Sequence, residues 1–479
     1  MILRVINHPY EFDMKNLCIT FFPHEKIRLE GEEDPVVVTT RRETDGSFFV
    51  SAKVYDVYRE TTAKPEPADE EHLVLSVTLY RLLSCILGFA PPWGVLYGVR
   101  PAKLMHRLCA QMGDDAAVAH FQTTFLTQKS KAELAHEVML HENRSIARSG
   151  PKSFSLYVSI PFCPTRCAYC SFVSHSIEKT HKLMTPYVDL LLRELEETSK
   201  YAKELGLELA TVYFGGGTPT TLSAQDLGRI FSTIEQNFDL SHLMEYTVEA
   251  GRPDTVTRER LEVIRAAGVQ RISINPQSFN DKVLEAIGRR HTAQQTLDAF
   301  ALARDCGFDH INMDFIAGLP EDDLPSFQRS IQTALDLQAE SITVHTLALK
   351  TSAYMVTREQ TFDLKDRLTV SNMVDYAGQT LHGAGYYPYY MYRQSKSLGN
   401  LENVGWCKPG YDCLYNVYMM DETHTVLAVG AGAVTKLRGQ NSGMIERIYN
   451  YKYPYEYIRD FDTLFERKKR IPGFYAEYD

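Results

Sequence analysis

Residues 157–172 read YVSIPFCPTRCAYCSF, and this stretch decides the fold. An apolar run leads into three cysteines, Cys163, Cys167 and Cys170, with the spacing C-x3-C-x2-C. Thiolates are soft ligands that select zinc, Cu(I) and iron–sulfur clusters. A structural zinc site takes four ligands, commonly in pairs, and no second cysteine pair lies nearby. Three thiolates on a [4Fe–4S] cluster leave one iron open to a ligand. The loop therefore predicts a catalytic metal site.

Two other interpretations of this loop compete with a metal centre. Free cysteine is often buried, so the three could be core residues that bind nothing. Three within eight residues, directly after an apolar run, disfavour that interpretation. A disulfide is disfavoured by the odd total of nine cysteines and by a chain start without secretory features. We expect a reducing, cytoplasmic setting.

The composition limits the partners of the chain. Its 479 residues are 44% hydrophobic and 23% charged, with a net charge of −10. An acidic protein gives no global support for binding nucleic acid or an anionic membrane, so an anionic substrate needs a local basic pocket. The most apolar stretch, residues 73–90, is interrupted by polar side chains and predicts a buried helix rather than a membrane span.

Residues 151–349 alternate between strand and helix patterns, which predicts a parallel sheet with helices outside. Six such units are too few for a closed eight-stranded barrel, so we expect an open (β/α)6 partial barrel. In this architecture the chemistry gathers at the carboxyl ends of the strands. The expected strands are 155–160, 211–214, 245–249, 271–275, 310–316 and 341–346, and the expected helices are 186–205, 223–238, 258–267, 293–306 and 324–337.

The flanking segments predict two smaller domains. Residues 1–150 have the pattern of an α+β domain of unknown role, with strands expected at 17–22, 36–40 and 48–58. One helix is expected from residue 70 until Pro91-Pro92 ends it. Further helices are expected at 100–112, 114–125 and 129–146. Residues 350–479 form a tyrosine-rich C-terminal domain. Its segment 386–394 predicts either a stacking face for a flat ligand or an aromatic core strand.

Polar and glycine-rich motifs follow the expected strands. Residues 215–217 are three glycines, which let a backbone approach a ligand closely and offer N–H groups. Glu249 ends the third strand, where a solvated rim charge is the alternative interpretation. Asp314 lies inside an apolar strand and therefore needs a partner. Cys407 and Cys413 could be metal ligands, but two thiols without a histidine favour plain cysteines.

These motifs carry a resemblance to a known family. The cysteine spacing, with an aromatic residue between the last two cysteines, resembles the radical S-adenosylmethionine (SAM) superfamily. The wider string, YVSIPFC followed by CAYCSF, resembles the oxygen-independent coproporphyrinogen III oxidase group (HemN, HemW and HemZ). The chain also has a long N-terminal segment and the string GNLENVGWCKPGYDCLYN at 399–416. With these features it is most similar to the HemZ branch. The resemblance implies a radical SAM partial barrel with a HemN-like C-terminal domain.

The same resemblance implies cofactors and a site. It implies a [4Fe–4S] cluster held by Cys163, Cys167 and Cys170. The open iron of this cluster is implied to bind the amino and carboxylate groups of SAM, and the chain is implied to bind either one SAM molecule or two. The residues implied to contact SAM are Tyr157, Gly216, Gly217, Thr218, Glu249, Gln277, Arg289, Asp314, Ala348 and Val434. Among these, Arg289 suits the SAM carboxylate because a guanidinium fork matches carboxylate geometry. The neighbouring Arg290 and His291 are as well explained by a solvated helix start.

The implied reaction is oxidative decarboxylation of two propionates of coproporphyrinogen III to vinyl groups, giving protoporphyrinogen IX. It implies an electron donor such as a flavodoxin or ferredoxin, and an electron acceptor. Arg393 or Lys396 could meet the propionates. The HemN oxidases carry a further cysteine two positions after the third ligand. At that position this chain has Phe172, and in this it resembles the HemW proteins. A HemW-like haem chaperone without turnover, and a radical SAM haem methyltransferase, therefore stay open as alternatives.

Overall fold

The computed structural model describes residues 1–479 except 24, 98–99, 171–174, 349–363 and 395–396. Its centre is a sheet in which six parallel strands lie side by side in chain order. These strands are β5 (Ser153–Ile160), β8 (Glu208–Gly216), β9 (Glu245–Glu249), β10 (Arg271–Ser273), β11 (His310–Ala317) and β12 (Ser341–Thr346). The expected partial barrel is confirmed, and each of the six strands lies where the sequence predicts it.

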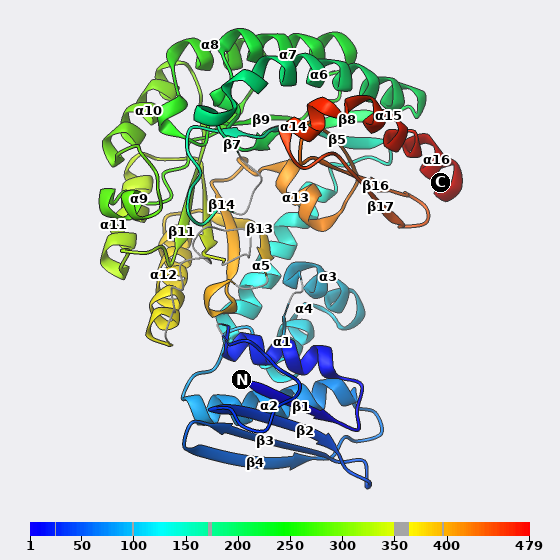
Figure 1. The fold of residues 1–479 in the computed structure, drawn as a ribbon, viewed down its shortest axis with the longest axis vertical. Helices are drawn as coiled ribbons and strands as arrows, with labels where there is room; N and C mark the ends of the chain where they lie inside the picture. The colour runs from blue at the N-terminus through cyan, green and yellow to red at the C-terminus, as the bar shows by residue number, and fades with distance from the viewer. Residues whose placement is uncertain (24, 98–99, 171–174, 349–363, 395–396) are drawn as a thin grey trace.

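Helices cover the outside of these strands in one arc (Figure 1). They are α6 (Ile177–Glu204), α7 (Ala224–Asn237), α8 (Arg258–Ala266), α9 (Asp281–Ala286), α10 (Ala293–Asp305) and α11 (Leu324–Asp336). Polar N-caps start most of them: the side chains of Ser223, Thr257, Asn280, Thr292 and Asp323 each accept a hydrogen bond from a first-turn amide. Such caps satisfy amides that have no intrahelical partner. The polar residue before each apolar pattern therefore sets where each helix begins.

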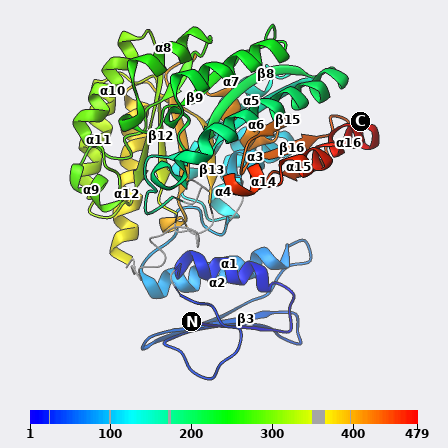
Figure 2. The same ribbon diagram turned by 45° about the horizontal axis from the view of Figure 1, so that its top comes forward.

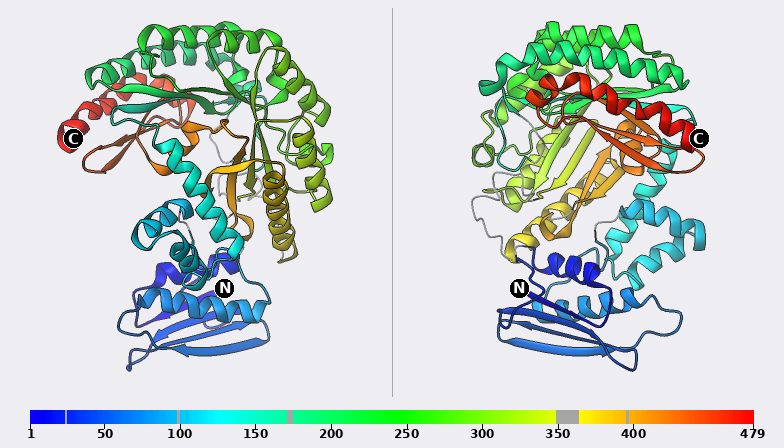
Figure 3. Two further views of the ribbon diagram at one scale, coloured as in Figure 1. Left: turned by 180° about the vertical axis from the view of Figure 1, so that it is seen from behind. Right: turned by 45° about the vertical axis from the view of Figure 1, so that its right-hand side comes forward.

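The C-terminal segment extends this same sheet at both edges. Strands β13 (Tyr387–Arg393) and β14 (Glu402–Cys407) add antiparallel strands beyond β12. At the other edge β15 (Thr425–Val429) pairs in parallel with β5, followed by β16 (Val434–Arg438) and β17 (Ile445–Tyr449). Around these strands lie α12 (Leu364–Gly383), α13 (Leu414–Asp421), α14 (Pro454–Arg459), α15 (Phe461–Lys468) and α16 (Arg470–Tyr478) (Figure 3).

A second sheet lies at the N-terminal end of the molecule, with α1 (Glu11–Phe21) and α2 (Glu71–Leu87) between it and the rest (Figure 2). Its strand order is β1 (Ile2–Ile6), β2 (Val36–Arg42), β3 (Phe48–Val54) and β4 (Val57–Ala63). These strands and helices share one hydrophobic core. The following helices α3 (Pro101–Met112), α4 (Asp114–Thr123) and α5 (Lys129–Ile146) lie as predicted and pack into the main core instead.

Two expectations for the N-terminal segment are wrong. The expected strand at 17–22 is the end of α1, which buries Met14, Leu17, Cys18 and Phe21. This spacing of three and four residues is helical, and burial of that face outweighs the β propensity of the segment LCITFF. The expected strand at 48–58 is a hairpin, because the chain reverses between β3 and β4 near Tyr55, whose φ is +53°.

Short elements complete the chain. They are the strands β6 (Phe162–Cys163) and β7 (His175–Ser176) and the 3-10 turns η1 (Pro219–Thr221), η2 (Pro253–Thr255) and η4 (Leu398–Asn400). Within the described residues, no helix has both the length and the apolar character that crossing a membrane requires.

A buried ion pair ties the C-terminal helices to the barrel. Lys468 on α15 lies 2.6 Å from Glu194 on α6, and neither side chain is exposed. The same carboxylate accepts hydrogen bonds from Tyr457 and Asn450 and from the amide of Gly430. Glu194 therefore joins three C-terminal segments to one barrel helix.

We expect Lys468→Met to lower the free energy of unfolding by about 3–5 kcal/mol, because it leaves the buried carboxylate of Glu194 without its cation. Denaturant unfolding measures the change. Lys469→Met is the matched control: its ammonium is exposed and pairs only with Glu466 across one helical turn. An equal loss in both variants would contradict a special role for the buried pair.

Candidate functional site

The cysteine loop begins at the carboxyl end of β5. Cys163 lies on β6, and Cys167 and Cys170 follow in the loop. Backbone contacts hold it against the turn after α9: the amide of Ala168 donates to Ile287 O at 2.9 Å, and the Thr165 hydroxyl donates to Gly288 O at 3.2 Å. The loop is therefore shaped by the fourth βα unit as well as by its own.

The glycine turn after β8 packs directly against this loop. A Cβ at Gly217 would lie 2.6 Å from Phe162 O and 2.9 Å from Ile160 O, so only glycine fits. The amides of Gly217 and Thr218 donate to those same two carbonyls at 2.7 and 2.8 Å. These N–H groups are thus engaged by the protein, contrary to the expectation that the turn offers them to a ligand. The Thr218 hydroxyl lies 3.4 Å from Cys163 Sγ.

A cavity of about 350 Å³ opens beside the cysteine loop at the carboxyl ends of the strands. It brings together five residues that the sequence assigns to the site, which are Cys170, Glu249, Gln277, Asp314 and Ala348. The sheet also places polar and aromatic side chains there that the sequence did not assign, including Tyr213, Arg271, Asn312 and Asn416, together with Tyr390 and Tyr392 of the tyrosine-rich segment. Alternation along the strands could have found some of these, because Arg271, Ser273 and Asn275 point inward at every second position.

Glu249 is held in the cavity by the hydroxyl of Tyr213, which donates to Oε1 at 2.6 Å. Burial raises the pKa of Glu249 to about 7, and the nearby charge of Asp314 adds to this, while Tyr213, Arg271 and His345 oppose it. A carboxyl group with this pKa changes charge near neutrality. Glu249 can therefore take up or release a proton when a cationic ligand arrives.

Asp314 remains ionised although its side chain is only 21% exposed. Burial alone raises its pKa, but hydrogen bonding and charge from His345, with help from Asn312, leave the pKa below its usual value. Asn312 donates to Oδ1 at 2.7 Å, and His345 Nε2 lies 3.7 Å from Oδ2. Tyr392 contacts the other ring nitrogen of His345 at 3.3 Å. A fixed carboxylate at a cavity wall is suited to accept hydrogen bonds from ligand hydroxyls.

Gln277 adopts a left-handed backbone conformation that residues other than glycine rarely take, with φ at +66°. Its amide donates to Asp314 O at 2.9 Å, and its own carbonyl accepts from Ile316 N at 3.2 Å. The buried side-chain oxygen has no hydrogen-bond partner among the described residues. Strain held by neighbouring backbone and an unpaired oxygen at a cavity wall are both features of ligand sites.

Arg289 lies beside the cysteine loop rather than in the cavity wall. Its Nη1 donates to Asn275 O at 2.6 Å and its Nη2 to the hydroxyl of Tyr169 at 3.3 Å. The buried Nε has no hydrogen-bond partner among the described residues. One donor of the guanidinium thus stays available next to Tyr169, which does line the cavity.

Two further site assignments lie outside the cavity wall. Tyr157 stacks on Tyr213 and Tyr415, at 6.3 and 5.9 Å between ring centroids, and so supports the residue that holds Glu249. Val434 starts β16 and pairs with Tyr449 at the far edge of the sheet. The cavity wall does not include Val434, and its contact with a SAM adenine stays a prediction.

The tyrosine-rich segment forms strand β13, with one tyrosine in the core and two at the cavity, and stacking on a flat ligand stays a prediction. Tyr389 is fully buried, whereas Tyr390 and Tyr392 line the cavity. Arg393 points elsewhere: it donates to Leu96 O at 2.8 Å and Asn400 O at 2.9 Å. The expectation that Arg393 meets a propionate is therefore wrong for this cavity. Lys396 and Phe172 lie outside the described residues.

Cys407 and Cys413 are buried among tyrosines, and the Cys413 thiol donates to Glu245 at 3.3 Å. Burial raises the pKa of Cys413, which favours the neutral thiol. This agrees with plain cysteines rather than metal ligands.

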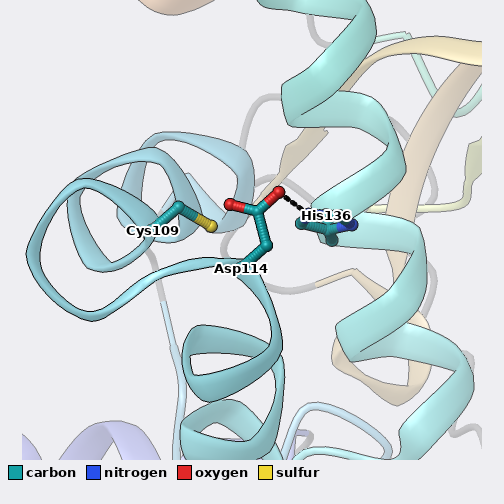
Figure 4. A group of neighbouring side chains, drawn as sticks. All are labelled: Cys109, Asp114 and His136. Carbon is teal, nitrogen blue, oxygen red and sulfur yellow. Dashed lines mark hydrogen bonds and ion pairs between the residues drawn. The ribbon is translucent and has the colours of Figure 1, made fainter.

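Cys109, Asp114 and His136 form a separate group where α3, α4 and α5 meet (Figure 4). His136 Nε2 lies 3.1 Å from the Asp114 carboxylate. Burial, together with the hydrogen bond to Asp114, raises the pKa of Cys109 to about 11. The thiol is therefore protonated at neutral pH, and the group links three helices through hydrogen bonds.

Comparison with known proteins tests the family. The model of the Radical SAM superfamily matches residues 157–334. The oxygen-independent coproporphyrinogen-III oxidase-like protein HemZ of Bacillus subtilis is 34% identical over 470 residues, which cover 95% of this chain and 94% of HemZ. The chain belongs to the HemN/HemW/HemZ group of radical SAM proteins, in its HemZ branch.

Other members of the group agree in part of the chain. The heme chaperone HemW of B. subtilis is 31% identical over 64% of this chain and 79% of HemW. The structure of coproporphyrinogen III oxidase HemN from Escherichia coli covers 68% of this chain and 72% of HemN, with a TM-score of 0.51 and 22% identity, which shows a shared fold. The N-terminal sheet and its two helices lie before the matched radical SAM region.

Family membership confirms that the cofactors are a [4Fe–4S] cluster and SAM. The residues present fit this pair. Three sulfur side chains share one loop, and the guanidinium groups of Arg252 and Arg289 lie beside Cys167. The cavity beside Cys170 offers the unpaired oxygen of Gln277 and the carboxylates of Glu249 and Asp314 to a cationic ligand.

We expect Cys163→Ala, Cys167→Ala and Cys170→Ala each to abolish stable cluster binding, because each removes one of three thiolate ligands. Iron and sulfide analysis of the reconstituted protein measures this. Cys407→Ala and Cys413→Ala are the controls and should keep full iron and sulfide. Retention of a complete cluster in all three loop variants would refute the ligand assignment.

We expect SAM affinity to rise with pH through about 7. Below the pKa of Glu249, binding that needs the carboxylate must first expel a proton, so affinity should fall by up to about tenfold for each pH unit. Binding isotherms between about pH 6 and pH 8 test this. Glu249→Gln should flatten the profile, whereas Glu235→Gln, on the exposed face of α7, should keep it. A steep profile in Glu249→Gln would assign the titration to another group.

Proposed function

We propose that this protein is an oxygen-independent coproporphyrinogen III oxidase, which converts two propionates of coproporphyrinogen III to vinyl groups and yields protoporphyrinogen IX. The cluster and SAM supply a 5′-deoxyadenosyl radical when they are bound. A hydrogen atom leaves the β-carbon of each propionate, and then CO2 and one electron leave. The reaction therefore needs an electron donor such as a flavodoxin or ferredoxin, and an electron acceptor.

The observation that carries this proposal is a basic group inside the cavity. Arg271 lies on β10 and lines the cavity, yet it is only 1% exposed. Its Nε and Nη1 atoms have no hydrogen-bond partners among the described residues. Glu245 lies near enough to offset part of this charge, but donors left unpaired on a buried guanidinium are costly, and a carboxylate is the ligand that matches their geometry best. This supports a substrate with a carboxylate that reaches into the barrel.

The geometry of His345 also favours turnover over simple haem binding. A chaperone needs an axial ligand such as a histidine or cysteine facing an open site. His345 lines the cavity, but Asp314 and Tyr392 engage its two ring nitrogens. Tyr390 and Tyr392 lie in the same wall with rings 6.3 Å apart and nearly parallel, a surface suited to a flat ring system.

Haem binding without turnover is the second candidate, and the similarity to HemW supports it. A radical SAM methyltransferase acting on haem is a third. In each case we propose a tetrapyrrole ligand and a cytoplasmic setting. The nine cysteines, all of which lie within the described residues and none of which forms a disulfide, support that setting.

An anaerobic turnover assay decides between these functions. The reconstituted, reduced protein receives SAM and coproporphyrinogen III, and chromatography follows porphyrin mass and 5′-deoxyadenosine. We expect loss of two CO2 coupled to deoxyadenosine, with Arg271→Gln slowing decarboxylation while its cluster content stays complete. Deoxyadenosine without any change in the porphyrin would reject this substrate. Stoichiometric haem binding without turnover would favour the chaperone function. An increase in the mass of haem by one methyl group would favour the methyltransferase function.

A further inference from the structure

The inference concerns Arg252, in the segment between β9 and η2, and it holds whichever tetrapyrrole is the substrate. Its guanidinium lies against the cysteine loop, and the residue is 2% exposed. Nη1 lies 3.7 Å from Cys167 Sγ, and it donates to the Thr165 hydroxyl at 3.2 Å. Nη2 donates to the same hydroxyl, also at 3.2 Å. One edge of the guanidinium thus faces the first half of the cysteine loop.

The opposite edge holds a carboxylate. Nε donates to one oxygen of Asp254 at 3.1 Å, and Nη2 donates to the other at 3.0 Å. The Asp254 side chain is 23% exposed, whereas that of Arg252 is 3% exposed. Water therefore screens the negative charge more than the positive one. The net field that Arg252 and Asp254 exert on Cys167 is positive.

We propose that Arg252 raises the reduction potential of the cluster by donating a hydrogen bond to the thiolate of Cys167. Hydrogen bonds to cluster sulfurs, buried positive charge and low solvent exposure are the levers that set the potential of iron–sulfur clusters. A donated hydrogen bond and a buried positive charge both stabilise the reduced form, which carries one more negative charge. Arg252 is a positioning residue, because it acts through Cys167 and does not touch the substrate.

A purely structural role makes a different prediction from this electrostatic one. If Arg252 only anchored the loop through Thr165, then removing its charge and removing that of Asp254 would both loosen the loop. An electrostatic role instead gives the two substitutions opposite signs. Arg252→Gln removes the positive charge beside Cys167. Asp254→Asn instead removes the negative charge that partly offsets it.

The test is a potentiometric titration of the cluster-loaded protein without SAM, in which electron paramagnetic resonance follows the reduced cluster. We expect Arg252→Gln to lower the ratio of reduced to oxidised cluster at a fixed potential by about tenfold, a midpoint shift of about 59 mV for one electron. Arg252→Lys keeps the positive charge but loses the forked geometry of the guanidinium. Its midpoint potential should therefore shift less than that of Arg252→Gln. Asp254→Asn should shift the midpoint upward.

Arg290→Gln is the matched control, since Arg290 is exposed near the same loop and, within the described part of the chain, forms an ion pair only with Glu178 at the surface. Its midpoint should equal that of the unchanged protein. An unchanged midpoint in Arg252→Gln with full iron content overturns the proposal. If Arg252→Gln does not hold a cluster, Asp254→Asn decides: an upward shift supports the proposal, and an unchanged or lower midpoint overturns it.

Discussion

The site depends on the parallel register between β5 and β8. Ser159 lies opposite Gly215 and Ile160 opposite Gly216, so the two strands end at the same level. Beyond that point the amides of the glycine turn donate to carbonyls of the segment that enters the cysteine loop. A shift of one residue would turn the inward side chains outward and separate the turn from the loop. The position of the cysteine loop, which we expect to hold the cluster, is thus set by backbone pairing.

The interior of the barrel is polar, and the fold compensates for this with paired groups. Tyr213 supports Glu249, while Asn312 and His345 support Asp314. Arg271 lies among them, and its Nε and Nη1 find no hydrogen-bond partner in the part of the chain that the structure describes. Burial of polar groups is tolerated only when partners satisfy them, so the groups left unpaired mark where a ligand belongs. The same logic distinguishes Arg271, open toward the cavity, from Arg252, whose donors are used on both edges.

The C-terminal segment is part of the site because it continues the central sheet. Strands β13 and β14 extend the sheet beyond β12 and bring Tyr390 and Tyr392 into the cavity wall. At the other edge β15 protects the first barrel strand by pairing with it. An open parallel sheet has two exposed edges, and covering both removes unpaired backbone groups. The tail therefore covers both edges of the six-stranded parallel sheet and also shapes the ligand cavity.

The sequence by itself determined the order of the barrel elements, because strand and helix periodicity are local signals. The spacing of the cysteines is equally local and predicts the cluster ligands. It also located Glu249, Gln277 and Asp314, since strand ends can be counted along the chain. It misplaced the segment 17–22, where burial of one helical face outweighed the β propensity of the residues. Only the tertiary structure decided that Arg271 faces the cavity, that Arg393 turns away from it, and that Arg252 reaches Cys167. Each of these depends on which distant backbone or side chain lies within reach of a long, flexible arginine, and no spacing in the sequence encodes that distance.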